Sequence, residues 1–169
     1  TYEWTPFLKS LFELDSSGNL ASYAEYMFSV IPGSWIGQIR EEYQYNANNY
    51  RILLENFTWD LLSNVWNKNS KTDYTYLGDG REIEQEYSVW DENGNFWVPA
   101  SKLVTTYSND ADTITQIDSY WQQATNQWLE FNKYQSMYSP SGFELLRTVY
   151  LWNSSILEWE PRYKFDFTP

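Results

Sequence analysis

The sequence predicts an all-β protein, an antiparallel up-and-down meander of tandem 31-residue units with two strands each. Three observations support this fold class. Tryptophans recur at one fixed spacing, small and Asx residues gather at two places in each unit, and β-branched and aromatic residues fill the segments between. Self-similarity at a fixed period, without insertion or deletion, is the signature of a repeat architecture.

All ten tryptophans fall into two columns of this repeat. The first column comprises Trp4, Trp35, Trp66, Trp97, Trp128 and Trp159. The second comprises Trp59, Trp90, Trp121 and Trp152, and Phe28 takes the remaining place. A third column is basic throughout: Lys9, Arg40, Lys71, Lys102, Lys133 and Lys164. Each unit therefore requires large rings and a cation at fixed positions.

Within one unit, a first turn covers residues 77–80, a strand follows from Glu82 to Trp90, a second turn covers residues 91–95, and a longer strand runs from Trp97 to Tyr107. Six long strands alternate with five short ones, so we expect about eleven strands. They would form one elongated, twisted sheet or superhelix, with a closed barrel as the alternative. No linker is visible, and residues 1–169 are expected to be a single β-repeat array, an excerpt of a longer secreted protein.

If side chains alternate strictly along each strand, equivalent residues of different repeats cannot all lie on the same face of the sheet. Along the long strand strict alternation places Trp97 and Tyr107 on one face and Lys102 on the other. Pairing across the two turns then assigns Trp90 to conflicting faces. A bulge or an odd-length loop must therefore intervene in each unit, at a place that the pattern does not reveal. For the basic column we expect a solvated sheet face with partial salt bridging.

Composition excludes several classes of function. The net charge of −12 would repel a phosphate backbone, so nucleic acid is not an expected partner. The chain has no cysteine and no histidine, which removes thiolate sites and the commonest general base and metal ligand. Acid pairs such as Asp110 with Asp112 occur in single repeats only. We expect no enzymatic activity, no cofactor, no metal site and no membrane span.

The tryptophans have two interpretations. They can pack as clamps between neighbouring hairpins, since aromatic pairs stabilise by about 0.5–1.5 kcal/mol beyond their area. They can also form a ladder, because strands of one type lie about 9.5 Å apart, close to two sugar units of an extended β-linked glycan. A row of flat rings at that spacing would stack on alternate sugars. The sequence does not show which column faces water.

The unit combines Tyr-x-Tyr, a Gly-containing turn, Trp-Asp, a six-residue gap, and Trp followed by Lys. It resembles the tandem Trp/Tyr-rich β repeats of large secreted and surface proteins of Bacteroidota, many of them exported by the type IX route. It is more distantly similar to the YD repeats of Rhs-type shells, although Leu77 and Ser108 stand where the Asp of the Tyr-Asp pair would be. The resemblance implies a secreted or cell-surface, non-enzymatic region with adhesion or glycan contact as its role.

We therefore expect a carbohydrate-binding region that stacks an extended polysaccharide on the column from Trp4 to Trp159. The alternative is a structural spacer or adhesin stalk of a large surface protein, with the tryptophans as packing clamps. Other domains of the same surface protein are further expected partners.

Overall fold

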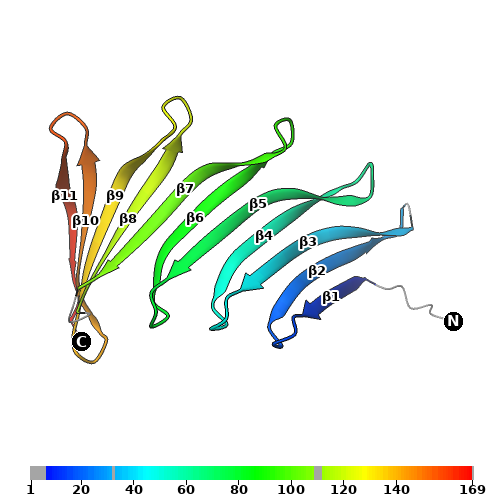
Figure 1. The fold of residues 1–169 in the computed structure, drawn as a ribbon, viewed down its shortest axis with the longest axis horizontal. Coiled ribbons are helices and arrows are strands. Elements are labelled where there is room, and N and C mark those ends of the chain that lie inside the picture. The colour runs from blue at the N-terminus through cyan, green and yellow to red at the C-terminus, as the bar shows by residue number, and fades with distance from the viewer. Residues whose placement is uncertain (1–6, 32, 109–111, 169) are drawn as a thin grey trace. The chain divides into compact units, whose positions relative to one another are not determined.

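In a computed structural model, residues 7–31, 33–108 and 112–168 are described and form eleven antiparallel strands in one open sheet. The strands follow one another across the sheet in chain order (Figure 1). They are β1 (Leu8–Leu14), β2 (Leu20–Ser29), β3 (Ser34–Tyr45), β4 (Arg51–Asp60), β5 (Val65–Tyr76), β6 (Glu82–Asp91), β7 (Phe96–Tyr107), β8 (Thr113–Gln122), β9 (Gln127–Tyr138), β10 (Glu144–Asn153) and β11 (Glu158–Asp166).

The predicted fold class is confirmed. The described residues contain no helix, and β1 and β11 are the two edges of the sheet, so the closed-barrel alternative is wrong. It follows that this part of the chain has no helix long and apolar enough to cross a membrane. Backbone contacts group the chain into two compact units, Thr1–Tyr74 with Tyr87–Val98 and Thr75–Glu86 with Pro99–Pro169. Each unit is described by itself below.

The two predicted turns recur along the sheet. In the first turn, residues such as Gly18, Asn49 and Gly80 adopt positive φ, between 61° and 91°. An Asx side chain closes several of these turns, as Asp15 Oδ1 does by accepting the backbone N–H of Ser17 at 2.8 Å. In the second turn the positive-φ residues occupy one column of the repeat: Gly33, Asn64, Asn95, Asn126 and Leu157.

A bulge in the long strand resolves the conflict between faces. In four hairpins one residue of the long strand has no partner opposite: Gln38, Asn69, Phe131 and Arg162. These four residues occupy equivalent positions in their 31-residue repeats, so the bulge is a feature of the repeat. Each bulge reverses the alternation between the tryptophan and the basic residue. The prediction that the basic column lies on the face opposite the long-strand tryptophans is therefore wrong, because strict alternation did not include this residue.

Consecutive hairpins pair along only part of their length. The two strands of one hairpin pair up to its tip, as Trp59 with Trp66 and then Asp60 with Val65. Between β9 and β10, however, the ladder begins only at Asn132 with Leu151 and continues away from the tips. Figure 1 accordingly shows the tips of the β8–β9 and β10–β11 hairpins apart. Side chains must fill the space between neighbouring hairpin arms.

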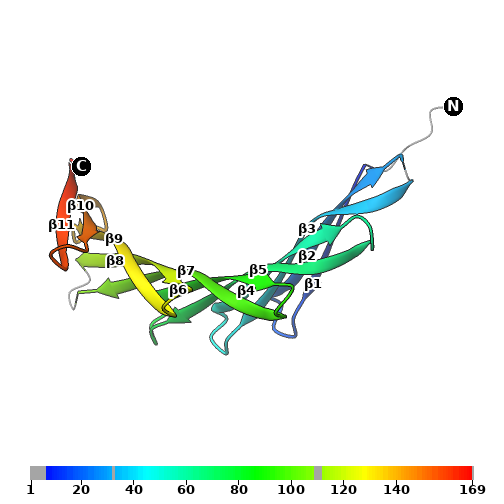
Figure 2. The same ribbon diagram turned by 90° about the horizontal axis from the view of Figure 1, so that it is seen from above.

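The sheet is a single layer. Among the described residues, no second layer of strands or helices covers it in either compact unit (Figure 2). None of the described apolar side chains is buried; the buried residues are Gly37 and the small polar ones Ser70, Ser88, Thr105, Ser119 and Ser136. Contacts between neighbouring side chains on one face must therefore supply what a core supplies in a layered domain.

Candidate functional site

A cross-strand aromatic pair stands at each described hairpin tip. The tryptophans of the short and long strands lie directly opposite one another, with ring centroids 4.9 to 5.2 Å apart and rings inclined by 68° to 73°. These pairs are Trp59 with Trp66, Trp90 with Trp97, Trp121 with Trp128, and Trp152 with Trp159. Phe28 and Trp35 form the same arrangement at 5.4 Å. Trp4 lies outside the described residues.

Both tryptophan columns thus lie on one face of each hairpin, which we call the tryptophan face. The edge of one ring meets the face of the other, the arrangement that the charge distribution of aromatic rings favours. Every described tryptophan is half-buried. The columns are therefore joined pairs and not two separate rows, a relation that the face conflict concealed in the sequence. Whether either column contacts a glycan stays a prediction.

One pair is seen to extend onto the preceding hairpin. The Trp66 indole donates a hydrogen bond from Nε1 to the Tyr26 hydroxyl at 3.1 Å, and the Tyr26 ring lies 6.0 Å from that of Trp59. A Cβ atom on Gly37 of β3 would stand 2.4 Å from Trp66 Cζ2 and 2.7 Å from Trp59 Cε3. The pair can lie against β3 because residue 37 has no side chain. Gly37 is not among the residues that the sequence pattern singled out.

Four lysines of the basic column lie over aromatic pairs at the hairpin tips, whereas Arg40 lies over Phe57 at 5.0 Å. The Nζ atoms of four lysines lie 4.6 to 5.8 Å from the ring centroid of the long-strand tryptophan of the next hairpin: Lys9 over Trp35, Lys71 over Trp97, Lys102 over Trp128, and Lys133 over Trp159. These are cation–π distances. The column also forms ion pairs, such as Lys71 with Asp73 at 2.6 Å. The expected partial salt bridging is present, and the rings are a second partner that sequence reasoning missed.

Lys68 adds a second cation over a tryptophan pair in the first compact unit. Its Nζ lies 4.8 Å from the Trp90 ring and 5.5 Å from the Trp97 ring, so one lysine serves both members of a pair. In the repeat it is the equivalent of Gly37, and the later members of this column are Pro99, Glu130 and Pro161. The residue at this column position therefore determines which side chain of the preceding hairpin each tryptophan pair contacts.

In the second unit, a cleft opens between the β8–β9 and β10–β11 hairpins. It has a volume of about 370 Å³. Two tryptophans from different pairs contribute to its lining, together with one carboxylate; the lining residues are Tyr120, Trp128, Leu129, Glu130, Trp152 and Ser154. The volume lies within the range of small-ligand sites.

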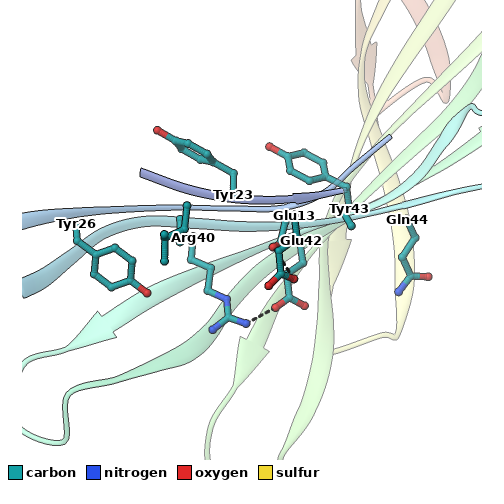
Figure 3. A pocket seen from close by; sticks show the side chains of 11 residues that line it. Glu13, Tyr23, Tyr26, Arg40, Glu42, Tyr43 and Gln44 are labelled. Carbon is teal, nitrogen blue, oxygen red and sulfur yellow. Dashed lines mark hydrogen bonds and ion pairs between the residues drawn. The ribbon is translucent and has the colours of Figure 1, made fainter. Parts of the chain in front are cut away.

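A second hollow, of about 460 Å³, lies over β1, β2 and β3 in the first unit. Figure 3 shows the Arg40 guanidinium directed at the Glu42 carboxylate, with an Nη2 to Oε1 distance of 2.5 Å. Tyr23 and Tyr43 point to the opposite side of these strands. Burial and a hydrogen bond to Glu41 raise the pKa of Tyr43, so its phenol stays protonated at neutral pH. The polar side chains of this hollow are therefore engaged in local pairs, Arg40 with Glu42 and Tyr23 with Glu25.

Three turn carboxylates have a lowered pKa for structural reasons. Hydrogen bonds from turn donors, first Asn19 N–H for Asp15, Ser63 Oγ–H for Asp60 and Arg81 N–H for Asp79, stabilise the charged forms. Within residues 7–31, 33–108 and 112–168, no three His, Cys, Asp or Glu side chains are grouped to hold a metal ion. Asp110, one of the acids that occur in a single repeat only, lies outside these ranges.

Comparison with known proteins places part of the chain next to a family. Residues 33–106 match the model of DUF3836, a family of unknown function. A protein of unknown function from Bacteroides fragilis shares the fold, with a TM-score of 0.67, 16% identity, and 77% of this chain and 92% of that chain covered. A DUF3836 protein from Bacteroides vulgatus gives a TM-score of 0.46 at 19% identity, over 53% of this chain and 89% of its own. No curated protein matches the chain.

The expected likeness to proteins of Bacteroidota thus holds at the level of fold and of a family match to residues 33–106. At 16% identity the Bacteroides fragilis structure shows a common fold and nothing about activity. The resemblance to the tandem Trp/Tyr-rich repeats of secreted proteins, the type IX route and the similarity to YD repeats find no support in these matches.

Proposed function

We propose that this chain is a non-catalytic structural region, a spacer or stalk of a larger secreted or surface protein, in which the tryptophans are packing clamps. One observation supports this most strongly. The same inclined pair recurs at every described hairpin tip, and the centroid distances of the four Trp–Trp pairs all lie between 4.9 and 5.2 Å. A constant geometry is what a packing role requires.

The surrounding contacts support the same role. Hairpin tips have no ladder between them where β9 and β10 diverge, and no second layer of described residues covers the sheet. Because Gly37 has no side chain, the Trp59–Trp66 pair packs against the neighbouring strand β3. Lysines lie over the rings and reduce the area open to a ligand. Each aromatic pair adds about 0.5–1.5 kcal/mol beyond the area it buries.

A polysaccharide-binding surface is the second candidate. It is favoured by the placement of all described tryptophans on one face of their hairpins while none is fully buried. A neutral glycan would stack on the long-strand tryptophans of one compact unit, Trp35, Trp66 and Trp97 in the first or Trp128 and Trp159 in the second. Aromatic platforms of this kind tolerate many ligands and need no catalytic group.

Tryptophan fluorescence separates the two candidates. The full chain is titrated with soluble β-glucan, xylan and mannan, and iodide quenching is measured with and without each glycan. The spacer predicts a blue-shifted emission, weak quenching and no response to any glycan. Strong quenching that a glycan protects against, and that Trp97→Ala weakens while the chain stays folded, would replace the spacer by the binding surface.

A further inference from the structure

The cleft in the second unit occupies the place that a lysine fills in the first. Lys68 Nζ lies 4.8 Å from the Trp90 ring and 5.5 Å from the Trp97 ring. Two repeats further along the chain, the equivalent positions hold Glu130, Trp152 and Trp159. The repeat thus keeps the tryptophan pair and replaces the cation above it by an anion.

Because of this replacement, the Trp152 ring has no cation over its face and the Glu130 carboxylate has no cationic partner among the described residues. Lys133 lies 5.5 Å from the Trp159 ring, but no lysine or arginine among the described residues lies over Trp152. Glu130 forms no ion pair or hydrogen bond within the described part of the chain. Both side chains line the same cleft of about 370 Å³.

We propose that this cleft binds an organic ammonium cation, stacked on Trp152 and held by the charge of Glu130. Cations are attracted to the faces of tryptophan rings, and ligand ammonium groups are recognised in this way between aromatic side chains. Tyr120 supplies a further aromatic wall and Ser154 a polar group at the rim, whereas Lys102 already lies over the Trp128 ring at 4.6 Å. The net charge of −12 raises the local concentration of cations.

The internal comparison favours a cation over a neutral sugar. Lysine ammonium groups already occupy the faces of Trp35, Trp97, Trp128 and Trp159 in the same chain. A ligand in the cleft would make the contact that Lys68 makes within the chain. Glu130 is exposed, so water solvates its carboxylate, but a neutral sugar would gain nothing from its charge, whereas an ammonium group would.

The test is a titration of the full chain, followed by tryptophan fluorescence at constant ionic strength. Tetramethylammonium and butylammonium chloride are the probes for quaternary and primary ammonium groups, sodium chloride is the salt control, and cellohexaose is the neutral ligand. We expect saturable changes with one or both ammonium salts and none with sodium chloride or cellohexaose.

Two substitutions at the site and one control complete the test. Glu130→Lys recreates the arrangement of Lys68 and should weaken ammonium binding by at least about tenfold, and Glu130→Gln should weaken it less. Glu92→Lys, which makes the same charge change at the exposed tip of the β6–β7 hairpin, should leave affinity within about twofold. Absence of saturable ammonium binding, an unchanged affinity in Glu130→Lys, or saturation by cellohexaose alone would overturn the proposal. The spacer is tested independently by iodide quenching.

Discussion

Single residues hold the backbone of each second turn in a left-handed conformation. Asn64, Asn95 and Asn126 adopt φ values of 51° to 56° there, and Gly33 adopts 81°. Leu157 stands at the equivalent position with φ of 57°. Asparagine and glycine tolerate this region, whereas a leucine Cβ is crowded by the following carbonyl oxygen. The last second turn is therefore the strained one.

We predict that Leu157→Asn stabilises the chain by about 1 kcal/mol, because it relieves this crowding. Urea unfolding followed by circular dichroism measures the change. Leu62→Asn is the matched control, since Leu62 is a 96% exposed tip leucine without positive φ, and it should change stability by less than about 0.5 kcal/mol. Equal effects of the two substitutions would show that polarity, and not φ, is responsible.

Gly37 gives a second prediction at this scale. Gly37→Ala should destabilise the chain by about 1–3 kcal/mol, because its Cβ would collide with the Trp66 ring at 2.4 Å. Gly78→Ala is the control, since a Cβ there meets nothing within 4 Å. Thermal unfolding of both variants tests the contact, and a Gly37→Ala protein as stable as Gly78→Ala would show that the rings do not lie against β3.

The sequence contained a signal for Gly37 that pattern reasoning did not use. A glycine inside a strand indicates close approach of another group, and residue 37 is glycine in a column that otherwise holds lysine, proline and glutamate. By contrast, nothing local distinguishes Glu130 from a solvated carboxylate. Its importance follows only from the cleft beside Trp152, and this cleft is visible only in the three-dimensional structure.

At the scale of the hairpin, we propose the inclined tryptophan pair as the stabilising unit. A double-mutant cycle on Trp90→Ala and Trp97→Ala should give a coupling energy of about 0.5–1.5 kcal/mol, since the rings are 4.9 Å apart. Trp90→Ala combined with Trp159→Ala, which joins members of different pairs, should be additive within about 0.5 kcal/mol. Additivity in the first cycle would remove the basis for calling the pairs clamps.

The turn carboxylates make hairpin stability depend on pH. Asp60 accepts hydrogen bonds from Ser63 Oγ at 2.6 Å and Leu62 N at 2.8 Å, and these lower its folded-state pKa. A depressed pKa stabilises the fold above the unfolded-state pKa, and this contribution is lost as pH falls through the folded-state value. Asp60→Asn should therefore be less stable than the parent at pH 7, with a gap that closes on acidification. A gap independent of pH would contradict this.

Strands and turns could be predicted at this scale, whereas faces could not. Turn residues such as Gly80 and Asn95 mark the element ends in the sequence, and the structure confirms them. The face of Lys71 depends on the single unpaired residue Asn69, which has no distinctive side chain. One inserted residue moves every later side chain of the strand to the opposite face, so strict alternation predicts the wrong face for the residues after the bulge.

For the whole molecule, the described residues contain no buried apolar side chain. Stability must then be spread over the hairpins as nearest-neighbour contacts, as in other repeat proteins. In such an arrangement the aromatic pairs act locally, and each substitution affects mainly its own hairpin and the next. This explains why aromatic residues make up 20% of a sequence whose overall composition is polar.

The central claim is that the tryptophans are held as inclined pairs. Far-UV circular dichroism tests it most directly, because two indoles fixed at a constant angle give an exciton couplet that free or unpaired rings do not. We predict a strong couplet in the full chain that is reduced by about one pair's share in Trp121→Phe and disappears on unfolding. A spectrum without a couplet in the folded chain would contradict the account.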